Sequence, residues 1–245
     1  MRKLLLITML LILASCSKDK VLKPDAAFDA EKTFEKANAY LEKKDYEQAR
    51  DLFLEVKSRD RTGKYAPLAQ LRYADSYFND GDIEPAVEQY KKFLDSNPDH
   101  KYAPYAQYQI AMAYFNQVAG VERGSGAAKK ALKEFEELKR LYPRNPYKST
   151  VEIKVAKCKD VIAGYEFIVG EFYFKKKAYE GAIGRLEGIL REFPDYRKEP
   201  QVLYMAAVSY NGLNNKEEAR RCLGLLSSKY PESPYLKEAQ KEIKK

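Results

Sequence analysis

The sequence of 245 residues contains little cysteine, histidine, glycine or proline. Three cysteines are too few for the disulfide framework of a small secreted domain. A single histidine, His100, excludes metal sites built on two histidines. Twelve glycines and eleven prolines exclude a collagen-like or low-complexity chain. Because 33% of the residues are charged and the long apolar run lies at the N-terminus, a polytopic membrane protein is excluded as well.

The remaining composition is that of a folded chain. Apolar residues make up 45% of the sequence, which is enough for a packed core and argues against disorder as the main state. Lysine and arginine outnumber aspartate and glutamate by 44 to 36, giving a net charge of +8. This modest excess favours anionic partners without identifying one.

The N-terminus has the pattern of an export signal. Positive charge in residues 1–3 precedes an apolar run from Leu4 to Ala14, which is too short to span a bilayer. The next residues complete the sequence Leu13-Ala14-Ser15-Cys16, which resembles the lipobox of bacterial lipoproteins. We therefore expect residues 1–15 to be a signal peptide and Cys16 to carry the lipid. The alternative is an ordinary secretory cleavage site with an incidental cysteine.

The location follows from the lipid. Several acyl chains together hold a protein on a membrane stably, whereas one chain is marginal. Ser17 occupies the position where lipoproteins retained at the inner membrane often carry aspartate, so the resemblance implies the periplasmic face of the outer membrane. Residues 16–27 are expected to be a flexible tether. An exported protein is not expected to bind nucleic acid.

Beyond residue 28 a helical pattern recurs. In each of five units an alanine opens an amphipathic segment, and a large apolar residue follows four positions later. A proline stands twelve positions after the alanine in the last four units, where it ends the helix. The alanines are Ala49, Ala86, Ala131, Ala182 and Ala219. Small residues let antiparallel helices approach closely. The pattern resembles the tetratricopeptide repeat and predicts an all-α solenoid of five helix pairs.

The spacing between successive units is longer in the middle of the chain. Successive alanines are 37, 45, 51 and 37 residues apart. A glycine-containing insertion at 118–125 predicts a loop, and apolar residues at helical spacing predict one long helix over about 147–176. This helix would link the third and fourth repeats. It divides the array into an N-terminal module of three repeats, 28–146, and a C-terminal module of two, 147–245.

This layout is similar to that of the BamD family of tetratricopeptide lipoproteins. The resemblance is carried by the stretch Tyr142-Pro143-Arg144-Asn145-Pro146-Tyr147 and by Arg185 to Pro194, together with the lipobox and the looped third repeat. It implies a non-enzymatic scaffold of the outer-membrane β-barrel assembly machinery. The implied partners are the POTRA region of the barrel-inserting subunit, unfolded outer-membrane proteins and accessory lipoproteins. No cofactor is implied besides the lipid on Cys16.

Two surfaces are candidates for this work. The first helices of the first three repeats carry aromatic and amide side chains, which suit an extended peptide whose terminal aromatic residue is the expected guest. These groove residues are Asn38, Phe78, Asn79, Tyr108, Phe115 and Asn116. The alternative is that aromatic residues at helical spacing belong to the core.

The second surface is in the fourth repeat, where Gly181, Gly184 and Gly188 lie off the apolar stripe beside Arg185. Each glycine in a helix interior lowers helix stability by about 1 kcal/mol relative to alanine. Three glycines on one face therefore suggest that something approaches the helix closely there. We expect a partner to approach this face, with Arg185 reaching a carboxylate across the contact. The alternative is close packing within the solenoid. The resemblance favours docking.

Other functions have less support. A different envelope tetratricopeptide protein, one that coordinates cell-wall synthesis with constriction, shares the pattern at 230–235 but not the lipobox or the stretched middle. An enzyme acting on peptidoglycan would need a carboxylate or nucleophile cleft, and the repeat surfaces offer no catalytic module. No catalytic or metal-binding residues are expected. Cys158 and Cys222 are expected to be buried apolar residues, with a disulfide as the alternative.

Overall fold

The computed structural model describes residues 28–243, which form helices joined by short connections. The signal peptide, the lipidation of Cys16 and the tether, which are all predictions, concern residues outside this range. The helices are α1 (Ala30–Glu42), α2 (Tyr46–Arg59), α3 (Ala66–Asp80), α4 (Ile83–Ser96), α5 (Ala103–Phe115), α6 (Gly126–Leu141), α7 (Lys148–Lys175), α8 (Tyr179–Glu192), α9 (Glu199–Gly212), α10 (Lys216–Lys229) and α11 (Pro234–Ile243), with a 3₁₀ helix, η1 (Val121–Arg123).

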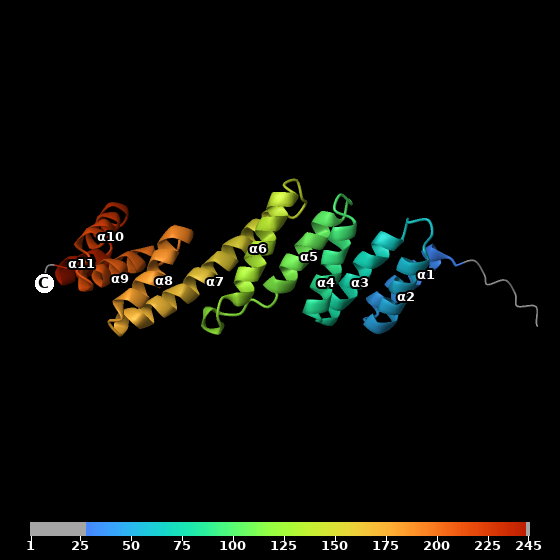
Figure 1. Cartoon of the computed structure of the whole chain (residues 1–245), viewed down its shortest axis with the longest axis horizontal. Coiled ribbons are helices and arrows are strands. Elements are labelled where there is room, and N and C mark those ends of the chain that lie inside the picture. The colour runs from blue at the N-terminus through green and yellow to red at the C-terminus, as the bar shows by residue number, and fades with distance from the viewer. Residues whose placement is uncertain (1–27, 244–245) are drawn as a thin grey trace, which may run out of the picture.

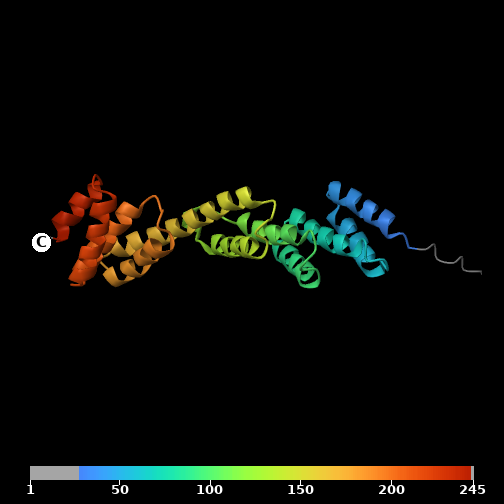
Figure 2. The same cartoon turned by 90° about the horizontal axis from the view of Figure 1, so that it is seen from above.

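The helices stack as antiparallel pairs along an extended array. The pairs are α1/α2, α3/α4, α5/α6, α7/α8 and α9/α10, and each packs on the next, as Figures 1 and 2 show. The α1 pair and the C-terminal helices lie at opposite ends of this array (Figure 1). The predicted solenoid of five helix pairs is confirmed. Helix α11 was not predicted; it packs mainly on α9 and covers the last pair, as capping elements of repeat arrays do.

Local sequence sets the helix boundaries. Pro67, Pro104 and Pro200 stand in the first turns of α3, α5 and α9, where a missing N–H leaves no hydrogen bond unmade. The side chains of Asp29 and Asp45 accept backbone N–H groups at the starts of α1 and α2. First-turn prolines and side-chain caps therefore account for the starts of these five helices.

The core follows the repeat pattern. All five repeat alanines are buried, and the large partners Phe53, Tyr90, Phe135 and Leu186 are fully buried. The fifth unit differs, because Leu223 is only partly buried while Cys222 and Leu226 fill the core there. Cys158 and Cys222 are buried free thiols, which confirms their expected packing role. Burial raises the pKa of the Cys158 thiol to about 11.

Helix α7 has the expected length and joins two parts of the array. Its N-terminal half packs on α6 through a cluster that includes Val151, Val155, Cys158 and Ile162. Its C-terminal half packs on α8 and α9. The expected insertion loop contains η1, and its Val121 lies so close to Gly164 that a Cβ there would be 2.8 Å from the valine Cγ1.

Candidate functional site

The predicted groove residues lie on α1, α3 and α5. The Asn38 amide donates to the carbonyl of Phe34 at 2.9 Å, within its own helix. The Tyr108 ring stacks on Tyr147 with centroids 4.2 Å apart, and the Lys154 Nζ lies 4.2 Å from the Phe115 ring centroid. The α5 aromatic rings therefore take part in packing between repeats as well as lining the surface.

The other groove residues lie on α3 and at the C-terminal end of α5. Phe78 is partly buried against the core of the second repeat, whereas Asn79 and Asn116 are exposed. Leu71 and Asp75, on the same helix as Phe78, are buried. The structure thus brings Tyr108, Phe115 and Asn116 together on α5, with Asn38 at the far end of the surface.

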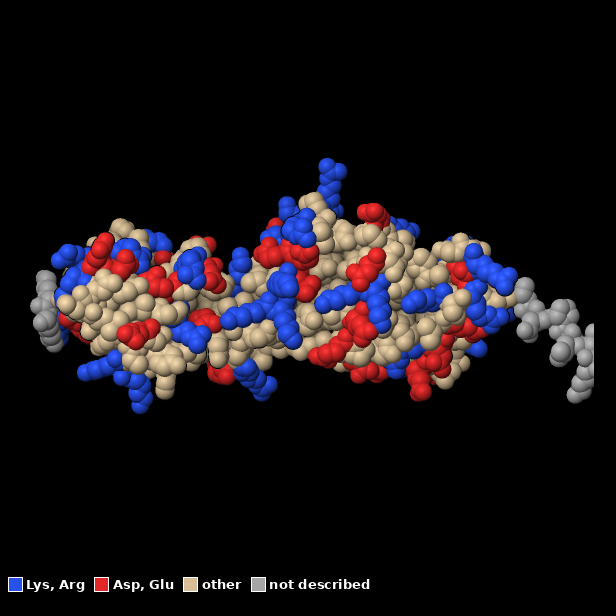
Figure 3. Space-filling model, in the orientation of Figure 1, with Lys and Arg blue, Asp and Glu red and all other residues tan. Residues whose placement is uncertain are grey.

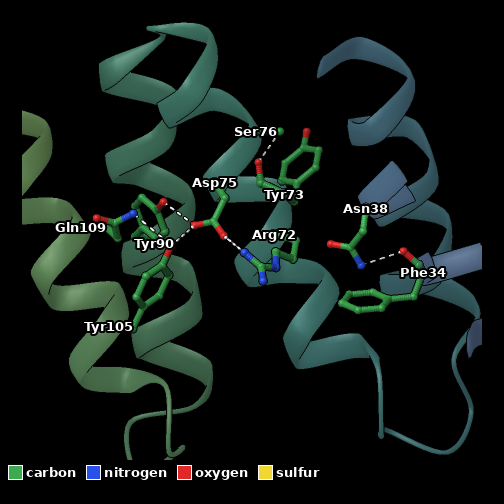
Figure 4. Close-up of polar contacts among 9 residues, drawn as sticks. All are labelled: Phe34, Asn38, Arg72, Tyr73, Asp75, Ser76, Tyr90, Tyr105 and Gln109. Carbon is green, nitrogen blue, oxygen red and sulfur yellow. Dashed lines mark hydrogen bonds and ion pairs between the residues drawn. The ribbon is translucent and has the colours of Figure 1, made fainter. Parts of the chain in front are cut away.

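A buried acid beneath this surface was not predicted. Asp75 on α3 is 3% exposed. Its carboxylate accepts hydrogen bonds from the Tyr90 hydroxyl at 2.6 Å, the Tyr105 hydroxyl at 3.0 Å and the Arg72 guanidinium at 2.9 Å (Figure 4). Gln109 donates in turn to the Tyr105 hydroxyl at 3.0 Å. A lone aspartate within an apolar helix stripe was the only sequence signal for this cluster.

Burial and hydrogen bonding shift the pKa of Asp75 in opposite directions. Burial raises the pKa of Asp75, and the hydrogen bonds from Tyr90, Arg72 and Tyr105 oppose this without reversing it. Burial and the neighbouring carboxylate raise the pKa of Tyr90 well above its ordinary value. The tyrosines therefore remain donors, and the carboxylate is held by groups from α3, α4 and α5.

The glycine row in α8 serves two different purposes. A Cβ at Gly181 would lie 3.1 Å from ring carbons of Tyr173, so this glycine accommodates α7. At Gly184 and Gly188 a Cβ would meet no heavy atom of the described residues within 4 Å. The expectation that all three glycines face a partner is therefore not met by Gly181, while Gly184 and Gly188 leave the helix backbone open.

Arg185 already has a carboxylate within the chain. Its guanidinium lies 2.9 Å from Glu166 on α7, and Lys129 on α6 lies 3.0 Å from the same side chain. Burial raises the pKa of Glu166, but the hydrogen bonds from Lys129 and Arg185 outweigh it and lower the pKa below its ordinary value. Because Glu166 orients only one edge of the guanidinium, Arg185, which is half exposed, keeps further donors at the surface.

An apolar stripe on α7 continues past the end of α6. Apolar residues alternate at spacings of four and three from Val151 to Phe172, the spacing of a helix-packing seam. The first half is covered by α6, but Tyr165 and Val169 are half-buried and Phe172 is 58% exposed. Ile168 beside them is also exposed.

This stripe and the open glycines lie on two helices that pack on each other. Helix α7 contacts α8 through Gly170 and Tyr173, and it contacts α9 through Glu171 and Phe174. On α7 Phe172 is exposed and Tyr165 and Val169 are half-buried, while on the adjacent helix α8 Gly184 and Arg185 are exposed and Gly188 is half-buried. We call Tyr165, Val169, Phe172, Gly184, Arg185 and Gly188 the α7–α8 face.

The described residues were compared with the requirements of a metal site and of a membrane-spanning helix. Residues 28–243 contain no group of three or more His, Cys, Asp or Glu side chains placed to hold a metal ion. Within the same range, no helix has the length and apolar character needed to cross a membrane. Acidic and basic side chains are interspersed over the face seen in Figure 3.

Comparison with known proteins identifies the family. The family model described as YfiO, outer membrane lipoprotein, matches residues 26–225. The chain belongs to this family. The matched range contains all the predicted groove residues and the α7–α8 face, and it ends within α10.

Curated relatives of this YfiO-family chain share the name outer membrane protein assembly factor BamD. The Caulobacter vibrioides protein is 26% identical over 115 residues, which cover 47% of this chain and 38% of that protein. The Rickettsia prowazekii protein is 29% identical over 110 residues, covering 45% and 44%. The Haemophilus influenzae protein is 29% identical over 103 residues, covering 42% and 36%. The alignments thus span less than half the length of these relatives.

Solved structures similar to the YfiO-family chain include tetratricopeptide proteins. The TPR2AB domain of yeast Sti1, in a complex with pHSP90, has a TM-score of 0.46 and 14% identity, covering 88% of this chain and 84% of that one. A thermophilic tetratricopeptide protein of Thermus thermophilus has a TM-score of 0.37 and 17% identity, covering 89% and 100%. The repeat assignment rests on the five helix pairs themselves.

Proposed function

We propose that this chain is a non-enzymatic scaffold lipoprotein of the machinery that assembles β-barrel proteins in the outer membrane. Membership of the outer membrane lipoprotein family supports this, as does the shared name of the relatives. In this proposal lipid on Cys16 holds the chain at the periplasmic face of the outer membrane. The repeat array presents two binding surfaces, one in its first three repeats and one in its fourth.

The docking part of the proposal rests on the α7–α8 face. Phe172 is a large apolar side chain left in solvent, and the neighbouring α8 backbone is bare at Gly184 and Gly188. An aromatic anchor beside a backbone that a partner can approach closely is typical of a protein interface, and arginine is enriched there. We assign this face to the POTRA region of the barrel-inserting subunit, with Arg185 offering its free donors to a carboxylate of that region.

The test of docking uses two matched pairs of variants. Gly188→Leu fills the face, while Gly224→Leu adds the same side chain at an open glycine on α10. Phe172→Asp removes the anchor, while Ile153→Asp changes an even more exposed apolar residue of the same helix. We expect Gly188→Leu and Phe172→Asp to lose copurification of the POTRA partner and their controls to retain it.

Melting temperatures decide how a loss is interpreted. All four variants should melt close to the wild type, because Phe172, Ile153 and Gly224 are exposed and Gly188, although half-buried, has no other side chain of the described residues within 4 Å of a Cβ built on it. If the controls lose the partner equally, or if Gly188→Leu unfolds the fourth repeat, the face is not a docking site.

Clients are assigned to the groove of the first three repeats. The aromatic rings on α5 and the amides of Asn38, Asn79 and Asn116 offer an extended chain both apolar contacts and hydrogen bonds. Photocrosslinkers at the exposed positions Asn79 and Asn116 should capture unfolded barrel proteins. A crosslinker at Leu54, an exposed residue on the second helix of its pair, should not. Equal capture at all three positions would contradict the groove assignment.

A further inference from the structure

We infer that the connection between α2 and α3 is a membrane-contacting surface that binds the phosphate groups of anionic phospholipids. The membrane is the one that holds the lipid on Cys16, so the inference rests on the lipid anchor of the proposed function. It adds which part of the array meets the membrane surface, which an anchor on a tether does not decide. Its basis is a row of exposed cations beside the point where the described chain begins.

The first repeat departs from the other four at this connection. Twelve positions after the repeat alanine the other units carry proline, whereas the first unit carries Arg61. Residues 57–64 contain four cations, Lys57, Arg59, Arg61 and Lys64, and one acid, Asp60. Every residue of this segment except Asp60 is exposed. The core of the repeat therefore does not use these cations, and the surface is where they act.

The acid of this segment is turned toward the backbone. One oxygen of Asp60 accepts the N–H of Thr62 at 2.9 Å. The other accepts the N–H groups of Tyr65 at 2.6 Å and Ala66 at 2.9 Å. Asp29 at the start of α1 likewise accepts a backbone N–H group, at 3.0 Å. These bonds fix the loop and occupy the carboxylates within the protein, so the neighbouring cations are left for a ligand.

The cations line an open hollow of about 880 Å³. Within residues 28–243, no acidic side chain forms an ion pair with Arg61 or Lys64. The Arg59 guanidinium pairs with an acid of its own helix and lies 4.3 Å from the Phe28 ring centroid. Besides the two aspartates that accept backbone N–H groups, Glu31 is the acid of the lining. Three cations facing one glutamate suit an anion that binds from solvent.

The entry of the chain places a membrane beside this hollow. Phe28 is the first described residue, and its ring lies against Arg59. The twelve residues 16–27 reach at most roughly 40 Å when fully extended. Figure 1 shows α1 and the α2–α3 connection at one end of the array, and Figure 3 shows basic side chains on that end. A lipid on Cys16 thus keeps headgroups at high local concentration, so even weak binding orients the array.

The residue types of the hollow suit a layer of headgroups. A phosphate accepts parallel N–H groups from a guanidinium and binds an ammonium as a point charge. Tyr65, half-buried beside Lys64, has the amphipathic ring that is common at membrane surfaces. Anionic lipids attract nearby basic side chains, and the attraction decays within a Debye length. The cations therefore act when the loop lies at the surface, which the tether brings about.

The experiment uses the mature chain with Cys16→Ser, produced without the signal peptide so that no acyl chain contributes. Its partition is measured by flotation with vesicles of phosphatidylcholine alone or mixed with phosphatidylglycerol. We expect binding to the mixed vesicles only, and a steep loss of binding as salt is added. Equal partition to the two kinds of vesicle overturns the inference. It leaves the scaffold proposal in place, because the intact mass of the wild type tests the anchor separately.

A matched pair of double variants assigns the binding to this connection. Arg61→Gln with Lys64→Gln should lower the partition coefficient by roughly twentyfold, about fivefold for each cation removed. Arg61→Lys should retain most of the binding, because it keeps the charge. Lys176→Gln with Lys177→Gln removes the same charge from the α7–α8 turn, where both lysines are exposed, and should bind as the parent chain does. An equal loss in both double variants would show attraction by net charge and overturn the assignment.

A fluorescent label measures which part of the array meets the vesicle. Ser58→Cys, in the lining of the hollow, and Ala178→Cys, in the α7–α8 turn, are labelled separately in the Cys16→Ser chain. The remaining thiols, Cys158 and Cys222, are buried. Lipids with a spin label on the headgroup should quench the label at residue 58 and not that at 178. Equal quenching at both positions, or stronger quenching at 178, would contradict the proposed orientation.

Discussion

Replacement of single glycines in α8 by alanine should separate the glycines that face solvent from the one that packs against α7. An alanine in a helix interior is more stable than a glycine by about 0.8–1 kcal/mol, because the glycine loses more backbone entropy on folding. At Gly184 and Gly188 a Cβ would meet no heavy atom of the described residues within 4 Å. Each alanine should therefore give the full gain, a rise in melting temperature of roughly 2–4 °C.

Gly181 provides the internal control. A Cβ at this position would lie 3.1 Å from the Cδ1 and Cγ atoms of the Tyr173 ring, closer than ordinary van der Waals contact. The ring belongs to the packed contact between α7 and α8, so its displacement opposes the gain in helix propensity. We expect Gly181→Ala to be neutral or destabilising. Its free energy of unfolding should fall below that of Gly188→Ala by about 1 kcal/mol.

The measurement is urea unfolding followed by circular dichroism, with hydrogen exchange of the α8 amides reporting on the fourth repeat alone. The local probe is needed because repeat arrays can unfold in parts. A loss of stability in Gly188→Ala as large as that in Gly181→Ala would refute the reasoning. Gly188 would then be required for packing inside the solenoid, and the α7–α8 face would lose its basis as a docking surface.

Three further predictions concern other parts of the chain. Although burial raises the pKa of Asp60, hydrogen bonds from Thr62, Tyr65 and Ala66 lower it from 3.8 to about 2. At a pH above the ordinary value of 3.8, the ionised Asp60 side chain stabilises the loop before α3, and this stabilisation is lost as the pH falls toward about 2. Asp60→Asn should therefore lower the free energy of unfolding by roughly 1 kcal/mol at neutral pH and by almost nothing in acid. Urea unfolding measured across this pH range tests the prediction. Tyr90→Phe removes the 2.6 Å hydrogen bond to buried Asp75 and should lower the free energy of unfolding by about 1.5–3 kcal/mol, and a change below about 0.5 kcal/mol would contradict the assigned bond. The intact mass of the protein purified from membranes should show acyl chains on a mature N-terminal Cys16, and an unmodified cysteine would contradict the lipid anchor.

The sequence alone determined the architecture because its pattern is local and repeated. A buried alanine with a large apolar partner four residues later marks one contact between two helices, and five recurrences predict five helix pairs. Proline marks helix starts and stops by the geometry of a single residue. The length of α7 followed from apolar residues at helical spacing between Pro146 and Gly164.

The tertiary structure alone decided what each of those helix faces contacts. Periodicity shows that a face is apolar or small, but it does not show which neighbour covers it, since that neighbour comes from a distant part of the chain. The Tyr105 hydroxyl meets Asp75 across 30 residues, and Arg185 meets Glu166 across 19. For the same reason Gly181 proved to be internal and Gly188 open, although the two have the same place in the sequence pattern. The α7 stripe is buried where α6 covers it and exposed at Phe172, which α6 does not reach. The sequence pattern is the same in both parts, so only the position of α6 distinguishes them.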